Sequence, residues 1–225
     1  MPLLSVVIIT FNEEKNITRC LESIVGVADE IVVVDSHSTD RTEAICKGYK
    51  VNFIPHDWDG YSATKNFANA LAKYDWILSL DADEALSEKL KASILEIKKN
   101  ERPITASFNR LTNYCGSWIK HCGWYPDKKI RLFDRRITSW KGSIHEELIT
   151  EPFQDIQHLN GDCLHYSYYS HEEHYQQADR FSTLAANSMF EKNKMISPLS
   201  IGLRAFMKFL RNRSEERRVG KECRL

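Results

Sequence analysis

The sequence lacks the features that mark several large classes of protein. Its formal net charge is zero, so nothing favours a general nucleic-acid binder, whose basic surface would neutralise phosphates. Its six cysteines include no CxxC pair, which argues against a zinc site and fits free thiols in a reducing compartment. It has no apolar run of roughly 18 residues, and no basic start of a signal peptide. We therefore expect a cytoplasmic protein without a membrane-spanning helix.

The end of the chain also lacks apolar periodicity. Residues 213–225 do not continue the helical pattern before them, and they resemble the in-frame translation of a sequencing-adapter oligonucleotide. We expect a non-native tail there and a natural protein that continues beyond Asn212. An ordinary charged tail is the alternative.

Strand-like and helix-like segments alternate four times in the first hundred residues. Short apolar runs at 3–9, 30–35, 51–54 and 76–80 are typical of strands buried on both faces. Amphipathic segments follow each run, and Asn12 is a good N-cap for the first helix. This order predicts an α/β fold in which helices flank a parallel sheet.

The pattern changes after residue 100. The segments 104–114, 129–134, 144–149 and 161–166 predict strands separated by turns. Two amphipathic helices are expected over 170–194 and from 199 to 210. The central sheet should therefore be mixed, with an antiparallel extension on its parallel half.

Polar side chains follow three of the first four predicted strands. In open α/β sheets, ligands bind outside the carboxyl ends of the strands, so these side chains should share one edge. They are Thr10, Asn12 and Glu13 after the first strand, Asp35 after the second, and Asp81 and Asp83 after the fourth. The last two acids would repel each other without a cation, and a divalent metal shared with a diphosphate is one reason to place them together. The alternative is that they cap the following helix.

Four segments follow one another with a specific order and spacing. They are Ser5-Val-Val-Ile-Ile-Thr-Phe-Asn-Glu-Glu14, Val33-Val-Asp-Ser-His-Ser-Thr-Asp-Arg-Thr42, Lys65-Asn-Phe-Ala68 and Leu80-Asp-Ala-Asp83. In these segments the chain resembles the family 2 glycosyltransferases. Segments 58–61, 131–133 and 140–146 are similar, more narrowly, to bacterial β-1,4-glucosyltransferase-like proteins of lipopolysaccharide core synthesis. The resemblance covers about residues 3–210.

The resemblance implies a nucleotide-diphospho-sugar transferase fold of GT-A type and an inverting transfer. Residues 1–100 would form the nucleotide-sugar-binding half, and 101–212 the acceptor-binding and C-terminal helical part of the same domain. The donor would be a nucleoside-diphosphate sugar, with a UDP-sugar favoured, and the cofactor Mn²⁺ or Mg²⁺. The acceptor would be a cell-envelope glycan or glycolipid, met at the inner face of the cytoplasmic membrane.

The resemblance also suggests roles for individual residues. The nucleoside would be held by Thr10, Asn12, Glu13 and Asp35, and Lys65 would lie near the base or the diphosphate. Asp83 would ligate the metal, while Asp81 would bind the ribose or a metal-bound water. His165 follows a predicted strand and would complete the metal shell, unless it is a structural histidine.

An inverting transfer needs a base for the acceptor hydroxyl. Glu146 is the first candidate and Asp127 the alternative. Trp140 would either stack on a sugar or lie in the core.

Two other functions are possible for a chain of this pattern. A sugar nucleotidyltransferase needs a glycine-rich basic loop after the first strand, but residues 10–14 are acidic and contain no glycine. An inactive, truncated sugar-nucleotide-binding protein is the other alternative. Near the end of the chain, basic Arg204, Lys208 and Arg211 beside Phe206 and Leu210 resemble a helix that contacts a membrane peripherally, although a soluble helix would look the same.

Overall fold

The chain folds as two compact units. The computed structural model describes residues 2–100, 102–142, 147–150, 155–191 and 197–222. The first unit comprises Met1–Arg110 and Lys128–Ser167, and the second comprises Leu111–Asp127 and Tyr168–Leu225. Within the described residues, no helix combines the length and apolar character that a membrane crossing requires.

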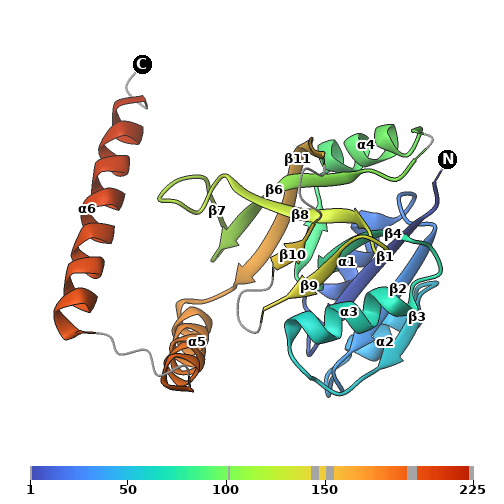
Figure 1. Cartoon of the computed structure of the whole chain (residues 1–225), viewed down its shortest axis with the longest axis horizontal. Coiled ribbons are helices and arrows are strands. Elements are labelled where there is room, and N and C mark those ends of the chain that lie inside the picture. Colours follow the sequence, from blue (N-terminus) through green and yellow to red (C-terminus); the bar gives the residue numbers. More distant parts are fainter. Residues whose placement is uncertain (1, 101, 143–146, 151–154, 192–196, 223–225) are drawn as a thin grey trace. The chain divides into compact units, whose positions relative to one another are not determined.

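Strands and helices alternate through the first hundred residues, as expected (Figure 1). In chain order these elements are β1 (Leu4–Thr10), α1 (Ile17–Ile24), β2 (Glu30–Asp35), α2 (Thr42–Lys47), β3 (Asn52–Pro55), α3 (Tyr61–Leu71), β4 (Trp76–Asp81), β5 (Glu84–Leu86) and α4 (Glu88–Ile97). The later elements are β6 (Thr105–Tyr114), β7 (Ser117–Ile119), β8 (Asp127–Asp134), β9 (Ser139–Lys141), β10 (Glu147–Ile149), β11 (Ile156–Tyr168), α5 (His171–Glu191) and α6 (Pro198–Glu222).

One mixed sheet organises the first unit. Among the described residues its strand order is β3-β2-β1-β4-β8-β6-β11-β5. Strand β7 pairs with Thr112–Tyr114 at the end of β6, and both segments belong to the second unit. Strands β3, β2, β1 and β4 run parallel to one another. Strand β8 runs antiparallel to β4, and β5 runs antiparallel to β11. The expected α/β class with a mixed central sheet flanked by helices is confirmed.

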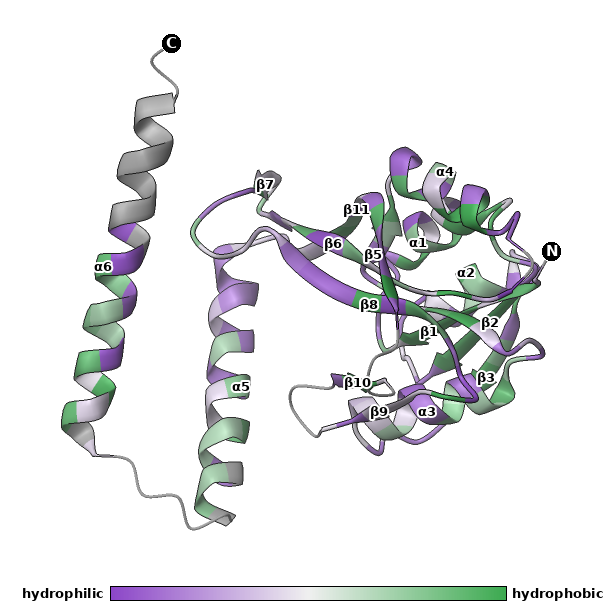
Figure 2. Ribbon diagram, turned by 45° about the horizontal axis from the view of Figure 1, so that its top comes forward, coloured by the Kyte–Doolittle hydropathy of each residue, from purple (hydrophilic) through white to green (hydrophobic). Residues whose placement is uncertain are grey.

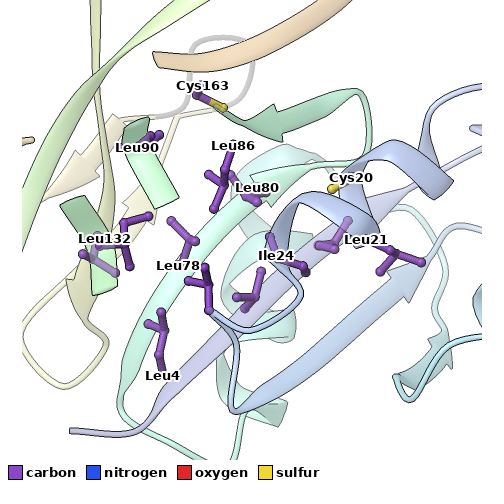
Figure 3. Close-up of a cluster of buried hydrophobic side chains, with 14 of the residues drawn as sticks. Leu4, Cys20, Leu21, Ile24, Leu78, Leu80, Leu86, Leu90, Leu132 and Cys163 are labelled. Carbon is purple, nitrogen blue, oxygen red and sulfur yellow. The ribbon is translucent and has the colours of Figure 1, made fainter. Parts of the chain in front are cut away.

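Side chains alternate between two cores on the two faces of the sheet. On β1, Leu4, Val6 and Ile8 join a cluster with buried residues of α1 and α4, and Figure 3 shows labelled members of this cluster. Val7 and Ile9 point to the opposite face and join a cluster with Ala68 and Ala72 at α3. All seven β1 residues are buried, which is why their sequence reads as a continuous apolar run. Figure 2 shows the same apolar character along β1 and β2.

Two expected helix caps are corrected by the structure. Helix α1 begins at Ile17, so Asn12 is not its N-cap. Instead Asn12 has a φ of 54°, a left-handed conformation that asparagine tolerates, and its Oδ1 accepts the Thr39 N–H at 2.8 Å. The loops after β1 and β2 are thereby tied together.

The second correction concerns the two acids after β4. They do not cap the next helix, because β5 intervenes and the Ser87 hydroxyl accepts the Leu90 N–H at the start of α4. The alternative reading of Asp81 and Asp83 as helix caps is therefore wrong. Asp40 lies just before α2, whose N-cap is Arg41, and its Oδ1 accepts the Thr42 N–H at 2.9 Å.

The second unit contains two long helices. Helix α5 ends near its expected boundary, but α6 continues to Glu222, through most of a segment for which no helical pattern was expected. Glutamate, arginine and lysine are good helix formers without any apolar periodicity, which accounts for the difference. Within this unit Tyr114 Oη lies 2.9 Å from His171 Nδ1 and 3.0 Å from His174 Nδ1, at the first turn of α5.

Candidate active site

The register of the sheet brings polar side chains to one edge of the first unit. Thr10 lies opposite Asp35 in the β1–β2 pair, and Ile9 lies opposite Asp81 in the β1–β4 pair. Three neighbouring parallel strands therefore end beside one another with Thr10, Asp35 and Asp81. The carboxyl ends of parallel strands are the usual place for a ligand in such a sheet.

Asp81 is held by two cations of the protein. Its Oδ1 lies 2.9 Å from Lys65 Nζ, and its Oδ2 accepts a hydrogen bond from Arg131 Nη2 at 2.9 Å. Both cationic side chains are buried, whereas the Asp81 carboxylate is about a quarter exposed. Burial alone would raise the pKa of Asp81, but Lys65 and then Arg131 outweigh it and hold that pKa far below its usual range.

Glu84 lies behind Asp81 as a fully buried carboxylate. Its Oε2 accepts the Asp81 backbone N–H at 3.0 Å, and its Oε1 lies 3.4 Å from Arg131 Nη2. Arg110 Nη1 approaches the same oxygen to 3.7 Å. A buried charge is tolerated only when it is paired, and here two arginines from β8 and β6 supply the pairing.

Asp83 and His165 form a second pair at this edge. His165 Nε2 lies 3.1 Å from Asp83 Oδ2, and both side chains are partly exposed. Burial opposes the charged imidazole, but the Asp83 carboxylate outweighs it and raises the pKa of His165. Asp83 is also fixed through its backbone, because its carbonyl oxygen accepts the Tyr166 N–H at 2.9 Å. An oxygen ligand and an imidazole so close together suit a divalent metal.

Glu13 belongs to the same electrostatic environment. Its Oε2 accepts a hydrogen bond from Asn16 Nδ2 at 2.8 Å. Burial and the negative charge of Asp83 raise the pKa of Glu13 to about 7. The loop after β1 thus brings Glu13 close enough to Asp83 for the two carboxylates to repel each other.

The residues expected to hold a nucleoside lie at the ends of β1 and β2. Thr10 Oγ1 is buried and has no hydrogen-bond partner among the described residues. Asp35 is buried, and both its oxygens accept hydrogen bonds from Ser38, one from the N–H at 2.8 Å and one from the hydroxyl at 2.5 Å. Asn12 is exposed in the loop that follows β1. Lys65, by contrast, is buried and directs its ammonium group at Asp81.

Comparison with known proteins gives this edge its context. The model of the glycosyl transferase family 2 matches residues 5–150, which include every strand of the parallel half. The chain belongs to family 2. An uncharacterized glycosyltransferase of Rickettsia typhi is 31% identical over 222 residues, which cover 94% of this chain and 76% of that one. The chain is therefore a glycosyltransferase.

Further similarities are narrower. The lipopolysaccharide core biosynthesis glycosyltransferase LpsC of Rhizobium meliloti is 29% identical over 203 residues, which cover 85% of this chain and 73% of LpsC. The crystal structure of S. aureus TarS in complex with UDP-GlcNAc aligns with a TM-score of 0.40 at 27% identity. That alignment covers 49% of this chain and 35% of the TarS chain.

The structure does not test the two candidate bases of the transfer. Glu146 lies outside the described residues, and Asp127 lies in the second unit at the start of β8. Both remain predictions for this family 2 chain.

Trp140 is a core residue rather than a platform for a sugar. Its ring is 5% exposed and packs edge-on against Phe133. Its backbone N–H and carbonyl oxygen both bond to the Asn66 side chain. Lys65 Nζ lies 4.9 Å from the ring centre, so the tryptophan supports a residue of the site from behind.

Sequence reasoning missed the roles of Glu84, Arg110 and Arg131. Glu84 was visible as a third acid after β4, and Arg131 stood between apolar residues of a predicted strand. An arginine at a buried strand position needs a counter-ion, so the sequence could have indicated that Arg131 pairs with an acid. Its partners lie on other strands, so spacing along the chain could not identify them.

Proposed function

We propose that the chain is an inverting, metal-dependent hexosyltransferase. It would move a sugar from a nucleoside-diphosphate donor, with a UDP-sugar favoured, to a glycan or glycolipid of the cell envelope. The observation that carries this proposal is that the two acids at and just after the end of β4, Asp81 and Asp83, have different partners. Asp81 is neutralised by Lys65 and Arg131, while Asp83 presents a partly exposed carboxylate beside His165.

The residues present fit a divalent ion such as Mn²⁺ or Mg²⁺. Asp83 Oδ2 and His165 Nε2 are separated by 3.1 Å, a spacing that two ligands of one ion can adopt. No group of three histidine, cysteine or acidic side chains that could hold a metal occurs within the part of the chain that the structure describes. Ions of this kind are commonly held by one or two carboxylates together with substrate phosphates and water. When bound, the ion would neutralise charge developing on the departing diphosphate.

The donor's nucleoside would lie at the ends of β1 and β2. The Thr10 hydroxyl, which is buried and has no partner in the part of the chain that the structure describes, supports this, because such a group costs free energy unless a ligand or water satisfies it. Asp35, Asn12 and Glu13 stand on the same two strand ends. Lys65 would contribute through Asp81, whose carboxylate it holds in place.

The chemistry assigned to the remaining residues is a single displacement. Glu146, or Asp127 instead, would accept the proton of the acceptor hydroxyl as its oxygen bonds to the anomeric carbon. The bond between that carbon and the diphosphate oxygen breaks, and the nucleoside diphosphate leaves with the electron pair. Attack from the face opposite the leaving group inverts the anomeric configuration.

A lipopolysaccharide-core-like acceptor is supported by the similarity to LpsC. Peripheral membrane contact is part of the same proposal and would be made by α6. This helix carries Arg204, Lys208 and Arg211 together with exposed Phe206 and Leu210. Basic and apolar residues on one helix suit an anionic lipid surface.

The function is tested by donor turnover in a panel of UDP- and GDP-sugars with Mn²⁺. The parent should hydrolyse or transfer one of them, and Asp83→Ala should lower kcat/KM at least about a hundredfold, as the loss of a ligand to a catalytic metal should. Glu96→Ala on α4 removes an exposed acid that pairs with the exposed Lys99, and this variant should match the parent. Equal turnover by Asp83→Ala and the parent would refute the metal role.

Membrane contact is tested separately by co-sedimentation of the full chain with vesicles. Binding to vesicles that contain phosphatidylglycerol should exceed binding to phosphatidylcholine alone and should weaken in high salt. A chain that stays in the supernatant with both would contradict it.

A further inference from the structure

The turn that carries Asp83 is flanked by two further acids, Asp81 and Glu84. Asp81 ends β4 and Glu84 begins β5, so only Ala82 and Asp83 lie between the two strands. Ala82 is buried, and the Asp83 carbonyl oxygen is bonded to the Tyr166 N–H of β11. The orientation of the Asp83 carboxylate therefore depends on how firmly the two flanking acids are held.

Glu84 contacts the other flanking acid, Asp81, and also Arg131. One of its oxygens closes the turn by accepting the Asp81 N–H, and the other lies 3.4 Å from Arg131. The same Arg131 nitrogen donates to the Asp81 carboxylate at 2.9 Å. Arg131 is thus shared by two acids, and its position between them depends on both.

The register of the sheet adds a second anchor. Glu84 lies opposite His165 in the antiparallel β5–β11 pair. The strand that supplies the imidazole beside Asp83 is therefore paired with the strand that begins at Glu84. A displacement of Glu84 would move the turn and His165 relative to each other.

The side chain of Glu84 is only 1% exposed, so it cannot serve as a direct ligand for a donor. Its carboxylate instead pairs with the buried Arg131, which would lose one of its counter-ions without it. We propose that Glu84 is a positioning residue, the buried counter-ion that holds Arg131 on Asp81 and closes the turn that presents Asp83 to the metal and diphosphate.

The experiment measures Mn²⁺ binding in the presence of saturating UDP, by the electron paramagnetic resonance of free Mn²⁺. Glu84→Gln keeps the size of the side chain and its ability to accept the Asp81 N–H, but it removes the charge that balances Arg131. Its dissociation constant for Mn²⁺ should rise about tenfold or more, as for other residues that orient a ligand from behind. Glu88→Gln removes the same charge from the exposed first turn of α4 and should leave the constant unchanged.

Because the role of Glu84 rests on the proposed metal and donor site, the parent is measured first. A parent that binds no Mn²⁺ with UDP refutes the proposed function. A parent that binds Mn²⁺, together with a folded Glu84→Gln variant that binds it equally well, overturns only the positioning role.

Circular dichroism establishes that the variant is folded. If Glu84→Gln does not fold, Arg110→Gln takes its place, because Arg110 is partly exposed and its Nη1 lies 3.7 Å from Glu84 Oε1. It should weaken Mn²⁺ binding in the same direction, several-fold. Binding as tight as the parent's would then overturn the positioning role.

Discussion

Replacing Lys65 by methionine tests whether the buried ion pair with Asp81 stabilises the first unit. Methionine is similar in length and fills the same space beside Trp140, but it carries no charge. The variant leaves Asp81 with Arg131 as its cation and removes the ammonium group 2.9 Å from Asp81 Oδ1. It also removes the cation from the Trp140 ring.

The size of the effect follows from the geometry. Two unit charges at this separation attract by about 6 kcal/mol at an effective dielectric constant of about 20, before the cost of removing both from water. Removing one partner of a fully buried pair costs about 3–5 kcal/mol. Asp81 is about a quarter exposed and keeps Arg131, so we expect Lys65→Met to lower the free energy of unfolding by about 2 kcal/mol.

The assay is urea unfolding followed by tryptophan fluorescence, applied to a double-mutant cycle. Lys65→Met, Asp81→Asn and the double variant together should give a coupling energy of about 1–2 kcal/mol. Lys99→Met removes an exposed lysine that pairs with Glu96 and should change stability by less than about 0.5 kcal/mol. A coupling energy near zero would refute the reasoning, because the two side chains would then contribute independently.

Two further predictions concern the scaffold around the site. Gly161→Ala should destabilise the chain by at least about 2 kcal/mol more than Gly60→Ala. Both glycines have φ near 100°, so the strain of the backbone conformation is similar. A Cβ at Gly161 would lie 2.3 Å from the Leu90 nitrogen, whereas a Cβ at Gly60 would meet nothing within 4 Å. Similar losses in urea unfolding would contradict this. Burial would raise the pKa of Asp40, but hydrogen bonds from the Thr42 hydroxyl and nearby N–H groups lower it below 3.8. Asp40→Asn replaces a charged acceptor by a neutral one, so it should cost about 1 kcal/mol at pH 7, and the difference from the parent should shrink as the pH falls below 3.8. A constant difference between pH 7 and pH 2.5 would contradict the linkage.

The parallel half could be predicted from the sequence because β1, β2 and β4 are each buried over a continuous run of residues. Strand β1 spans the seven residues Leu4–Thr10 and β4 the six residues Trp76–Asp81. Runs as apolar as these are expected only in strands that are covered on both faces. The strands β5, β7 and β9 could not be predicted, because three residues are too few to show an alternation of period two.

The candidate site was predictable in its acids but not in its cations. Strand ends carry Asp35, Asp81 and Asp83, and a parallel sheet brings such ends together without any further information. The pairing of Asp81 with Arg131 depends on β8 lying beside β4, an antiparallel contact between distant segments that no local pattern encodes. The left-handed backbone of Asn12 was likewise hidden, because asparagine is common both at helix caps and in left-handed turns.

The proposed site assigns the metal to Asp83 and not to Asp81. A crystal structure of the full chain with Mn²⁺ and UDP, with the ion located by its anomalous scattering, distinguishes the two acids. We expect an anomalous peak about 2.2 Å from an Asp83 oxygen, with Asp81 still held by Lys65 and Arg131. A peak on the Asp81 carboxylate, or UDP bound while Asp83 keeps only His165 as its partner, would contradict it.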